Sequence, residues 1–236
     1  MQHLPVYVYI VFAITFVLTV GLFYKATGYA KPFLTVLIVW VTLQSILGLK
    51  GFYSDANTST ARFPLLFLPP LLALIFRFIT KKGRVFIDKL DMPTLTLLSV
   101  IRIPVELVLF WLFVHKSIPE AMTFHGRNFD IFSGLTAPLV YYFGFKKHQI
   151  SYKLMLVWNF ICVALLINVV ANAILSLPGR YASFGYDQPN VALCYFPFLL
   201  LPACIVPLVM FSMLASIRQL LIKIKKEKAE HSISII

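Results

Sequence analysis

Long apolar stretches alternate with short polar segments along the whole chain. Seven of them approach the ~20 residues that an α-helix needs to cross a hydrocarbon core of about 30 Å. They cover residues 4–23, 33–49, 63–79, 95–114, 128–145, 154–175 and 191–214. These stretches are apolar on every side, whereas barrel strands alternate polar and apolar positions. The pattern predicts an all-α, polytopic membrane protein with seven transmembrane helices.

The composition supports this class. Hydrophobic residues make up 60% of the 236 residues and charged residues only 13%, against about 25% charged in a soluble domain. No segment between the apolar stretches is long enough for a second domain. We therefore expect a seven-helix transmembrane domain over residues 1–218 and a basic cytoplasmic tail over residues 219–236.

Basic residues are distributed unevenly between the two sets of loops. Of the 21 Lys and Arg residues, 15 follow the first, third, fifth and seventh stretches, 5 lie on the opposite side, and the last is Arg102. Short cytoplasmic loops retain positive charge, so the N-terminus is predicted outside and the C-terminus inside the plasma membrane. The net charge of +12 is then explained by topology and by contacts with anionic membrane lipids. Nucleic acid is not needed to explain it.

A short motif occurs twice. Residues 63–69 and 196–202 both read F-P-x-L-x-L-P, and both stretches run from outside to inside in the predicted topology. Each is preceded by an aromatic-Lys pair and then by a Val-Trp pair in the same order. The pattern suggests two parallel three-helix units joined by the fourth helix, a 3+1+3 plan. Chance recurrence of Leu, Phe and Pro in apolar sequence is the alternative.

Two resemblances follow. The 3+1+3 plan with an external N-terminus is similar in layout to the SWEET and PQ-loop carriers, although neither unit contains a Pro-Gln motif. Several segments resemble an uncharacterised family of small bacterial membrane proteins, which implies an inner-membrane setting and no particular activity. These segments are residues 51–53, 102–106, 124–130 and 195–198.

Two charges interrupt the fourth stretch. Arg102 and Glu106 are four residues apart, so on a helix they share one face and are expected to form an ion pair. Pro104 between them lacks an N–H and should disturb the helix there. Ionisable residues inside a membrane span are costly and by default mark functional sites. A purely structural pair that holds helices together is the alternative.

The sixth stretch supplies a possible partner face. Asn168, Asn172 and Ser176 recur every four residues and form one polar stripe. At about 1.5 Å per residue, Glu106 and Asn168 lie at a similar depth, about 12–14 Å inside the outer surface. Asparagines also hold membrane helices together by hydrogen bonds. A structural role for these residues is therefore the alternative.

The start of the fifth stretch adds further polar residues. Its apolar part is short, so the helix should begin near Asn128, which places Asn128 and Asp130 at an outer mouth. Either residue could instead cap the helix. A metal site is the least favoured reading, because the spacing of the available ligands matches no known pattern. Those ligands would be His115, Glu120, His125 and Asp130.

The leading hypothesis is a small-solute carrier or ligand-binding protein with an outward-facing polar cavity. Its small-molecule or ion site would comprise Arg102, Glu106, Asn128, Asp130, Asn168 and Asn172, with no cofactor. One alternative is a membrane enzyme acting on a lipid or isoprenoid, because residues 104–107 weakly resemble the Pro-x-Glu-Glu element of membrane carotenoid cyclases. The other alternative is a noncatalytic sensor or assembly subunit. The sequence leaves open whether the protein is an enzyme.

The charge distribution gives a testable topology. Reporter fusions after Lys147 and Ile236 should report the cytoplasm, and a fusion after Pro189 should report the exterior. Activity of a cytoplasmic and a periplasmic reporter at each point measures this. An external signal at Ile236 would overturn the assignment of every loop.

Overall fold

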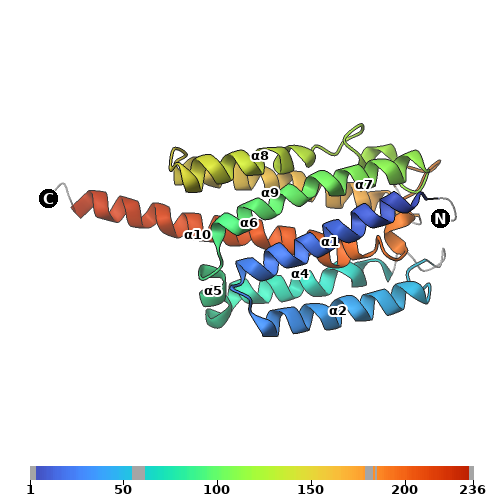
Figure 1. The fold of residues 1–236 in the computed structure, drawn as a ribbon, viewed down its shortest axis with the longest axis horizontal. Coiled ribbons are helices and arrows are strands. Elements are labelled where there is room, and N and C mark those ends of the chain that lie inside the picture. Colours follow the sequence, from blue (N-terminus) through green and yellow to red (C-terminus); the bar gives the residue numbers. More distant parts are fainter. Residues whose placement is uncertain (1–3, 55–61, 179–182, 184, 234–236) are drawn as a thin grey trace.

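The computed structural model describes residues 4–54, 62–178, 183 and 185–233. Helices account for 77% of the structure, and no strand occurs among the described residues. The all-helical prediction is therefore confirmed. The helices form an elongated bundle, and the C-terminal helix projects beyond one end of it (Figure 1). The first helix begins at the opposite end.

Each predicted apolar stretch contains a helix. The α-helices are α1 (Val6–Ala26), α2 (Lys31–Leu49), α4 (Pro64–Ile79), α5 (Lys81–Asp88), α6 (Met92–Leu98), α7 (Arg102–Val114), α8 (Ile131–Tyr141), α9 (Tyr152–Leu175) and α10 (Val206–Ile233). Short 3-10 helices are η1 (Ser99–Ile101), η2 (Glu120–Met122) and η4 (Ala192–Cys194), and π-helical turns are η3 (Tyr142–Lys146) and η5 (Leu201–Ile205).

Among the described residues, five helical segments are long and apolar enough to cross a membrane, and a sixth is added if a bent pair counts as one span. The bent pair is α4 and α5, whose axes differ by 93°. The remaining segment, α8 with its π turn η3, covers only Ile131 to Lys146. The structure thus supports a membrane protein with several apolar helices. The seventh crossing and the orientation of the termini stay predictions.

The sharp turn between α4 and α5 has a local cause. Thr80 is extended, with ψ at 143°, and its Oγ1 accepts a hydrogen bond from the Gly83 backbone N–H at 3.2 Å. This side chain caps the new helix. We call residues 77–84 the elbow.

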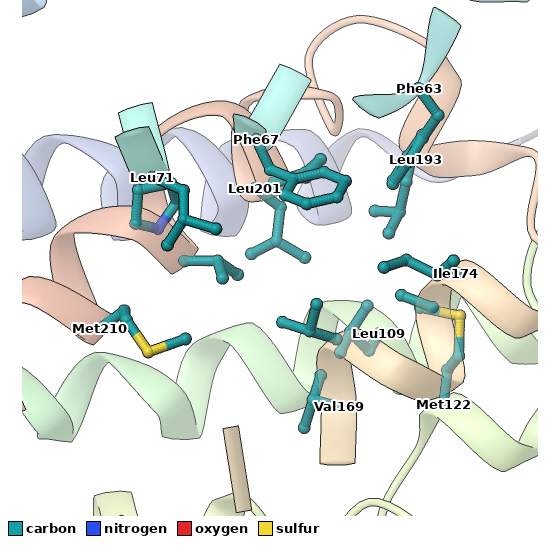
Figure 2. Close-up of a pocket in the computed structure, with 15 residues that line it drawn as sticks. Phe63, Phe67, Leu71, Leu109, Met122, Val169, Ile174, Leu193, Leu201 and Met210 are labelled. Carbon is teal, nitrogen blue, oxygen red and sulfur yellow. The ribbon is translucent and has the colours of Figure 1, made fainter. Parts of the chain in front are cut away.

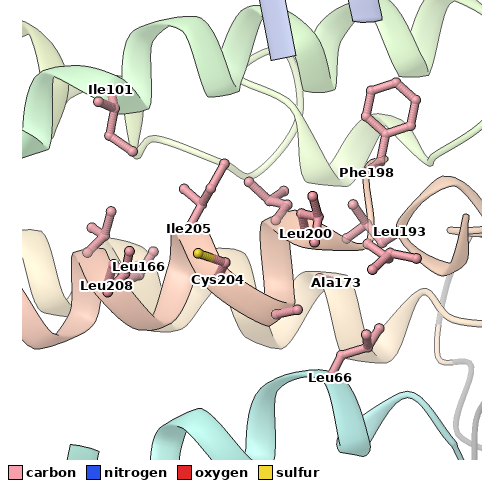
Figure 3. Close-up of a cluster of buried hydrophobic side chains, with 14 of the residues drawn as sticks. Leu66, Ile101, Leu166, Ala173, Leu193, Phe198, Leu200, Cys204, Ile205 and Leu208 are labelled. Carbon is pink, nitrogen blue, oxygen red and sulfur yellow. The ribbon is translucent and has the colours of Figure 1, made fainter. Parts of the chain in front are cut away.

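Helix α10 is the centre of the bundle. It packs against α9, α6, α4, α5 and α1, and its apolar side chains join one core with residues of the surrounding helices. Figure 3 shows part of this core, where Cys204, Ile205 and Leu208 lie among side chains of α9 and η1. The helix continues without a break to Ile233. The residues predicted as a separate tail therefore begin, at Gln219 and Leu220, as buried parts of this same helix.

Large apolar side chains also cover the outside of the bundle. Val36 and Leu49 of α2 are each 70% exposed, and α1, α4, α8 and α9 carry further exposed aliphatic and aromatic residues. Soluble monomers rarely expose apolar patches of this extent. The helices therefore indicate a membrane location.

The two copies of the F-P-x-L-x-L-P motif differ in structure. The first lies almost entirely within α4, which contains Pro69 and Pro70. The second begins in a turn and enters the π turn η5, where Pro202 lies. Phe198 and Leu201 in the second copy are buried, whereas the matching Leu65 and Leu68 in the first are exposed. The matching Leu66 and Leu199 are buried in both copies. The 3+1+3 repeat stays a prediction.

Gly83 is the residue that makes the elbow possible. A Cβ atom there would lie 2.6 Å from Thr80 Oγ1 and 2.7 Å from the backbone carbonyl carbon of Arg77. Because backbone cannot move aside cheaply, Gly83→Ala should lower the free energy of unfolding by about 1–3 kcal/mol. Thermal unfolding followed by circular dichroism in detergent measures this.

The matched control is Gly21→Ala, because no heavy atom lies within 4 Å of a Cβ built at Gly21 of α1. Its stability should be unchanged or slightly higher, since Ala favours helix. Equal unfolding midpoints for the two variants would contradict the assigned geometry of the elbow.

Candidate functional site

The helix that carries the intramembrane charges is irregular at that point. From Met92 to Val114 the chain is helical, but Ser99–Ile101 adopts 3-10 geometry immediately before Arg102. Pro104 cannot donate the N–H that would bond to the carbonyl of Val100 in an α-helix. The predicted disturbance beside Arg102 is therefore present.

Arg102 forms its ion pair with Asp130. Its Nη1 donates to Asp130 Oδ1 at 2.5 Å, and both side chains are almost completely buried. The guanidinium also donates to the Cys162 carbonyl at 3.4 Å and to Met213 Sδ at 2.7 Å. The predicted Arg102–Glu106 ion pair was wrong. Helical spacing places the two residues on one face, but the arginine reaches a neighbouring helix instead.

Gly134 explains why Asp130 reaches Arg102. A Cβ at Gly134 would lie 2.8 Å from Ile103 Cγ1 and 3.3 Å from the Ser99 carbonyl oxygen. The missing side chain therefore lets α8 approach η1 and α7 closely. Asp130 lies one helical turn before this contact and immediately precedes α8. A small residue on one helix thus positions an acid beside a cation on another.

Glu106 is held by an amide. Asn128 Nδ2 donates to Glu106 Oε1 at 2.6 Å and to the Met122 carbonyl at 3.0 Å. Asn128 Oδ1 in turn accepts from the backbone N–H of Asp130 at 3.0 Å. Asn128 therefore connects the carboxylate of Glu106 to the segment that carries Asp130.

We refer to Arg102, Glu106, Asn128 and Asp130 as the polar cluster. Their exposed fractions are 2%, 1%, 0% and 4%, so the cluster is closed from solvent, and the predicted exposed mouth at Asn128 and Asp130 was wrong. Two of its atoms, Glu106 Oε2 and Arg102 Nε, are buried without a hydrogen-bond partner among the described residues. Unpaired buried polar atoms cost free energy, which makes them the notable atoms of the cluster.

The two predicted asparagines of α9 lie beside the cluster. Asn168 Nδ2 donates to the backbone carbonyl of Arg127 at 2.7 Å, and Asn172 Nδ2 donates to Asn168 Oδ1 at 3.3 Å. The matched depth predicted for Asn168 and Glu106 agrees with this, because they bind consecutive residues, 127 and 128. No hydrogen bond between Glu106 and either α9 asparagine occurs in the described structure. Asn168 therefore attaches the segment before α8 to α9, and Asn172 bonds to Asn168 from one turn further along α9.

An apolar cavity of about 100 Å³ lies next to this cluster. Figure 2 shows Phe67 and Leu71 of α4 across the cavity from Leu109 and Val169. All of its lining residues are apolar. Leu109 is one turn beyond Glu106, and the lining residue Met122 supplies the carbonyl that binds Asn128. The cavity therefore borders the polar cluster through these two residues.

The described residues contain no group of three or more His, Cys, Asp or Glu that could hold a metal ion. Cys162, Cys194 and Cys204 are buried free thiols.

No protein-family model, curated protein or solved structure matches the chain.

The structure predicts which acid stabilises Arg102. Arg102→Leu should lower the free energy of unfolding by about 3–5 kcal/mol, because Asp130 is left as an unpaired buried charge. Arg102→Leu/Asp130→Leu should recover most of that loss, since the replacement of a whole buried pair by apolar residues is often neutral. Chemical unfolding in detergent measures the three stabilities.

The matched control is Arg102→Leu/Glu106→Gln, which should stay as unstable as Arg102→Leu. Glu106→Gln alone should change stability by less than about 1 kcal/mol, because its side-chain oxygen still accepts the bond from Asn128. Recovery by the Glu106 substitution and not by the Asp130 substitution would show that Glu106 is the partner of Arg102.

Proposed function

We propose that the protein is a membrane carrier or ligand-binding protein in which Glu106 binds a proton or a cation. The observation that supports the proposal is the hydrogen bonding of the Glu106 carboxyl group. One oxygen accepts a hydrogen bond from Asn128, and the other is buried without a partner. The nearest cation in sequence, Arg102, is engaged by Asp130.

The charges of the cluster explain why Glu106 would take up a ligand. Arg102 and Asp130 neutralise each other as an ion pair. An ionised Glu106 would then leave one net negative charge in a site with low dielectric constant, which is unfavourable. A proton or a small cation on Oε2 removes that charge. Proton-binding carboxyl groups inside membrane bundles are typical of transport pathways.

Movement of a ligand requires the closed cluster to open. The segment that closes it, residues 127–130, is attached to α9 through Asn168 and precedes α8. Irregular backbone borders this region where η1 interrupts the helix before Arg102, and a second irregular turn, the π turn η3, lies at the far end of α8. Such interruptions are common at functional sites and at the discontinuous helices of carriers. In this proposal they are the points at which the bundle changes shape.

A specific observation also favours a second candidate, an enzyme that acts on a lipid or isoprenoid. The cavity beside the cluster is entirely apolar and is bordered by Leu109 and Met122. An apolar substrate in this cavity would lie next to the Glu106–Asn128 pair. Glu106 would then act as a general acid that donates its proton to the substrate.

The proposal predicts a protonated carboxyl group at Glu106. Infrared difference spectra of the protein in lipid, recorded between low and high pH, should contain the C=O stretching band of a carboxylic acid. Glu106→Gln should remove the contribution of the Glu106 carboxyl group to this band. The control variant Glu120→Gln should retain it, because Glu120 is an exposed acid outside the cluster.

Two assays on the same variants separate the candidates. Transport predicts proton flux into proteoliposomes that contain a trapped pH-sensitive dye, and Glu106→Gln should abolish it. An enzyme predicts instead that lipid extracts of cells expressing wild type differ from those expressing Glu106→Gln. If Glu106→Gln leaves the infrared band, the flux and the lipid extracts unchanged, the charges are structural. A sensor or assembly subunit would then be the better description.

A further inference from the structure

A second site lies at the other end of the bundle, at the elbow between α4 and α5. The elbow borders an open surface hollow of about 550 Å³ lined by Arg77, Thr80, Lys81 and Lys82, together with Ala73, Phe76 and Gly83. It shares no residue with the polar cluster. In the predicted topology this end of the bundle faces the cytoplasm.

The hollow is strongly positive. Arg77, Lys81 and Lys82 are exposed, and the ion pairs of the described structure, Arg102–Asp130 and Arg218–Asp88, include none of them. The first turn of α5 contains no acidic residue. Cations at a helix N-terminus are unfavourable, because that end of a helix is itself positive. An anion held between the three side chains would relieve this repulsion.

An apolar groove of about 250 Å³ continues from the hollow. It runs between α2, α4 and α10, and the two spaces share Ala73 and Arg77. Apart from Arg77, every lining residue of the groove is apolar, including Trp40 of α2 and Phe211 of α10. The combined site is therefore amphiphilic, with three cations at one end and hydrocarbon along the rest.

The surrounding contacts hold this shape. The guanidinium carbon of Arg77 lies 5.3 Å from the centre of the Phe86 ring. Gln219 Nε2 of α10 donates to the carbonyl of Ile87 in α5 at 2.7 Å and to that of Leu90, two residues beyond α5, at 3.0 Å. On the other wall of the groove, Trp40 Nε1 donates to the Ala203 carbonyl at 2.8 Å.

We propose that the elbow and groove bind an acidic phospholipid. The phosphate headgroup contacts Arg77, Lys81 and Lys82, and one acyl chain lies in the groove against Trp40. Charge complementarity favours an acidic phospholipid as the ligand, because basic pockets between helices on the cytoplasmic side bind anionic headgroups. A zwitterionic lipid such as phosphatidylcholine brings no net negative charge to the three cations, and free phosphate leaves the groove unfilled.

Quenching of Trp40 fluorescence tests the proposal. A Trp111→Phe/Trp158→Phe protein leaves Trp40 as the only tryptophan. Brominated phosphatidylglycerol should quench it at a lower mole fraction than brominated phosphatidylcholine. Lys81→Gln/Lys82→Gln in this background should weaken the phosphatidylglycerol effect by about tenfold to thirtyfold, since each cation near an anionic headgroup contributes about a factor of five.

The matched control is Lys225→Gln/Lys226→Gln, which removes two exposed cations from the far part of α10. It should quench like the parent protein. Inorganic phosphate at constant ionic strength should not reverse the quenching, because it cannot fill the groove. Equal quenching by the two lipids, displacement by phosphate alone, or protection of Trp40 by self-association would each overturn the proposal.

Discussion

The buried ion pair between Arg102 and Asp130 is the interaction on which the packing of α7, α8, α9 and α10 around the polar cluster depends. A lone guanidinium among apolar helices would be prohibitively costly. Asp130 neutralises it, and the Cys162 carbonyl and Met213 sulfur satisfy further donors. Four helical segments are thereby connected at one point, since these groups come from α7, from the start of α8, from α9 and from α10.

The pairing of Arg102 with Asp130 also determines the state of Glu106. Because the arginine is engaged elsewhere, Glu106 has an amide, Asn128, as its hydrogen-bond partner and one unpartnered oxygen. The cluster thus contains one acid, Asp130, that is engaged in an ion pair, and a second acid, Glu106, that is not. The apolar cavity beside Leu109 and the apolar groove next to the elbow both border α10, where they share the lining residue Pro207.

The sequence predicted the helices and the residues of the polar cluster, but not how those residues pair. Apolar run length and residue spacing are local properties, so the helix positions and the disturbance at Pro104 could be read directly. The partner of Arg102 lies 28 residues away, and the close approach at Gly134 brings it there. No pattern in the sequence near Arg102 or near Asp130 predicts that contact. The bend at Thr80 was also missed, although a threonine followed three residues later by glycine matches the observed cap.

The most direct test of this account is labelling by an apolar carbodiimide, which reacts with protonated carboxyl groups inside membranes. The protein in lipid would be treated with the reagent, digested, and the modified residues identified by mass spectrometry. The account predicts modification of Glu106, with Asp130 protected by its ion pair with Arg102. Modification of Asp130 with Glu106 unreacted would contradict it.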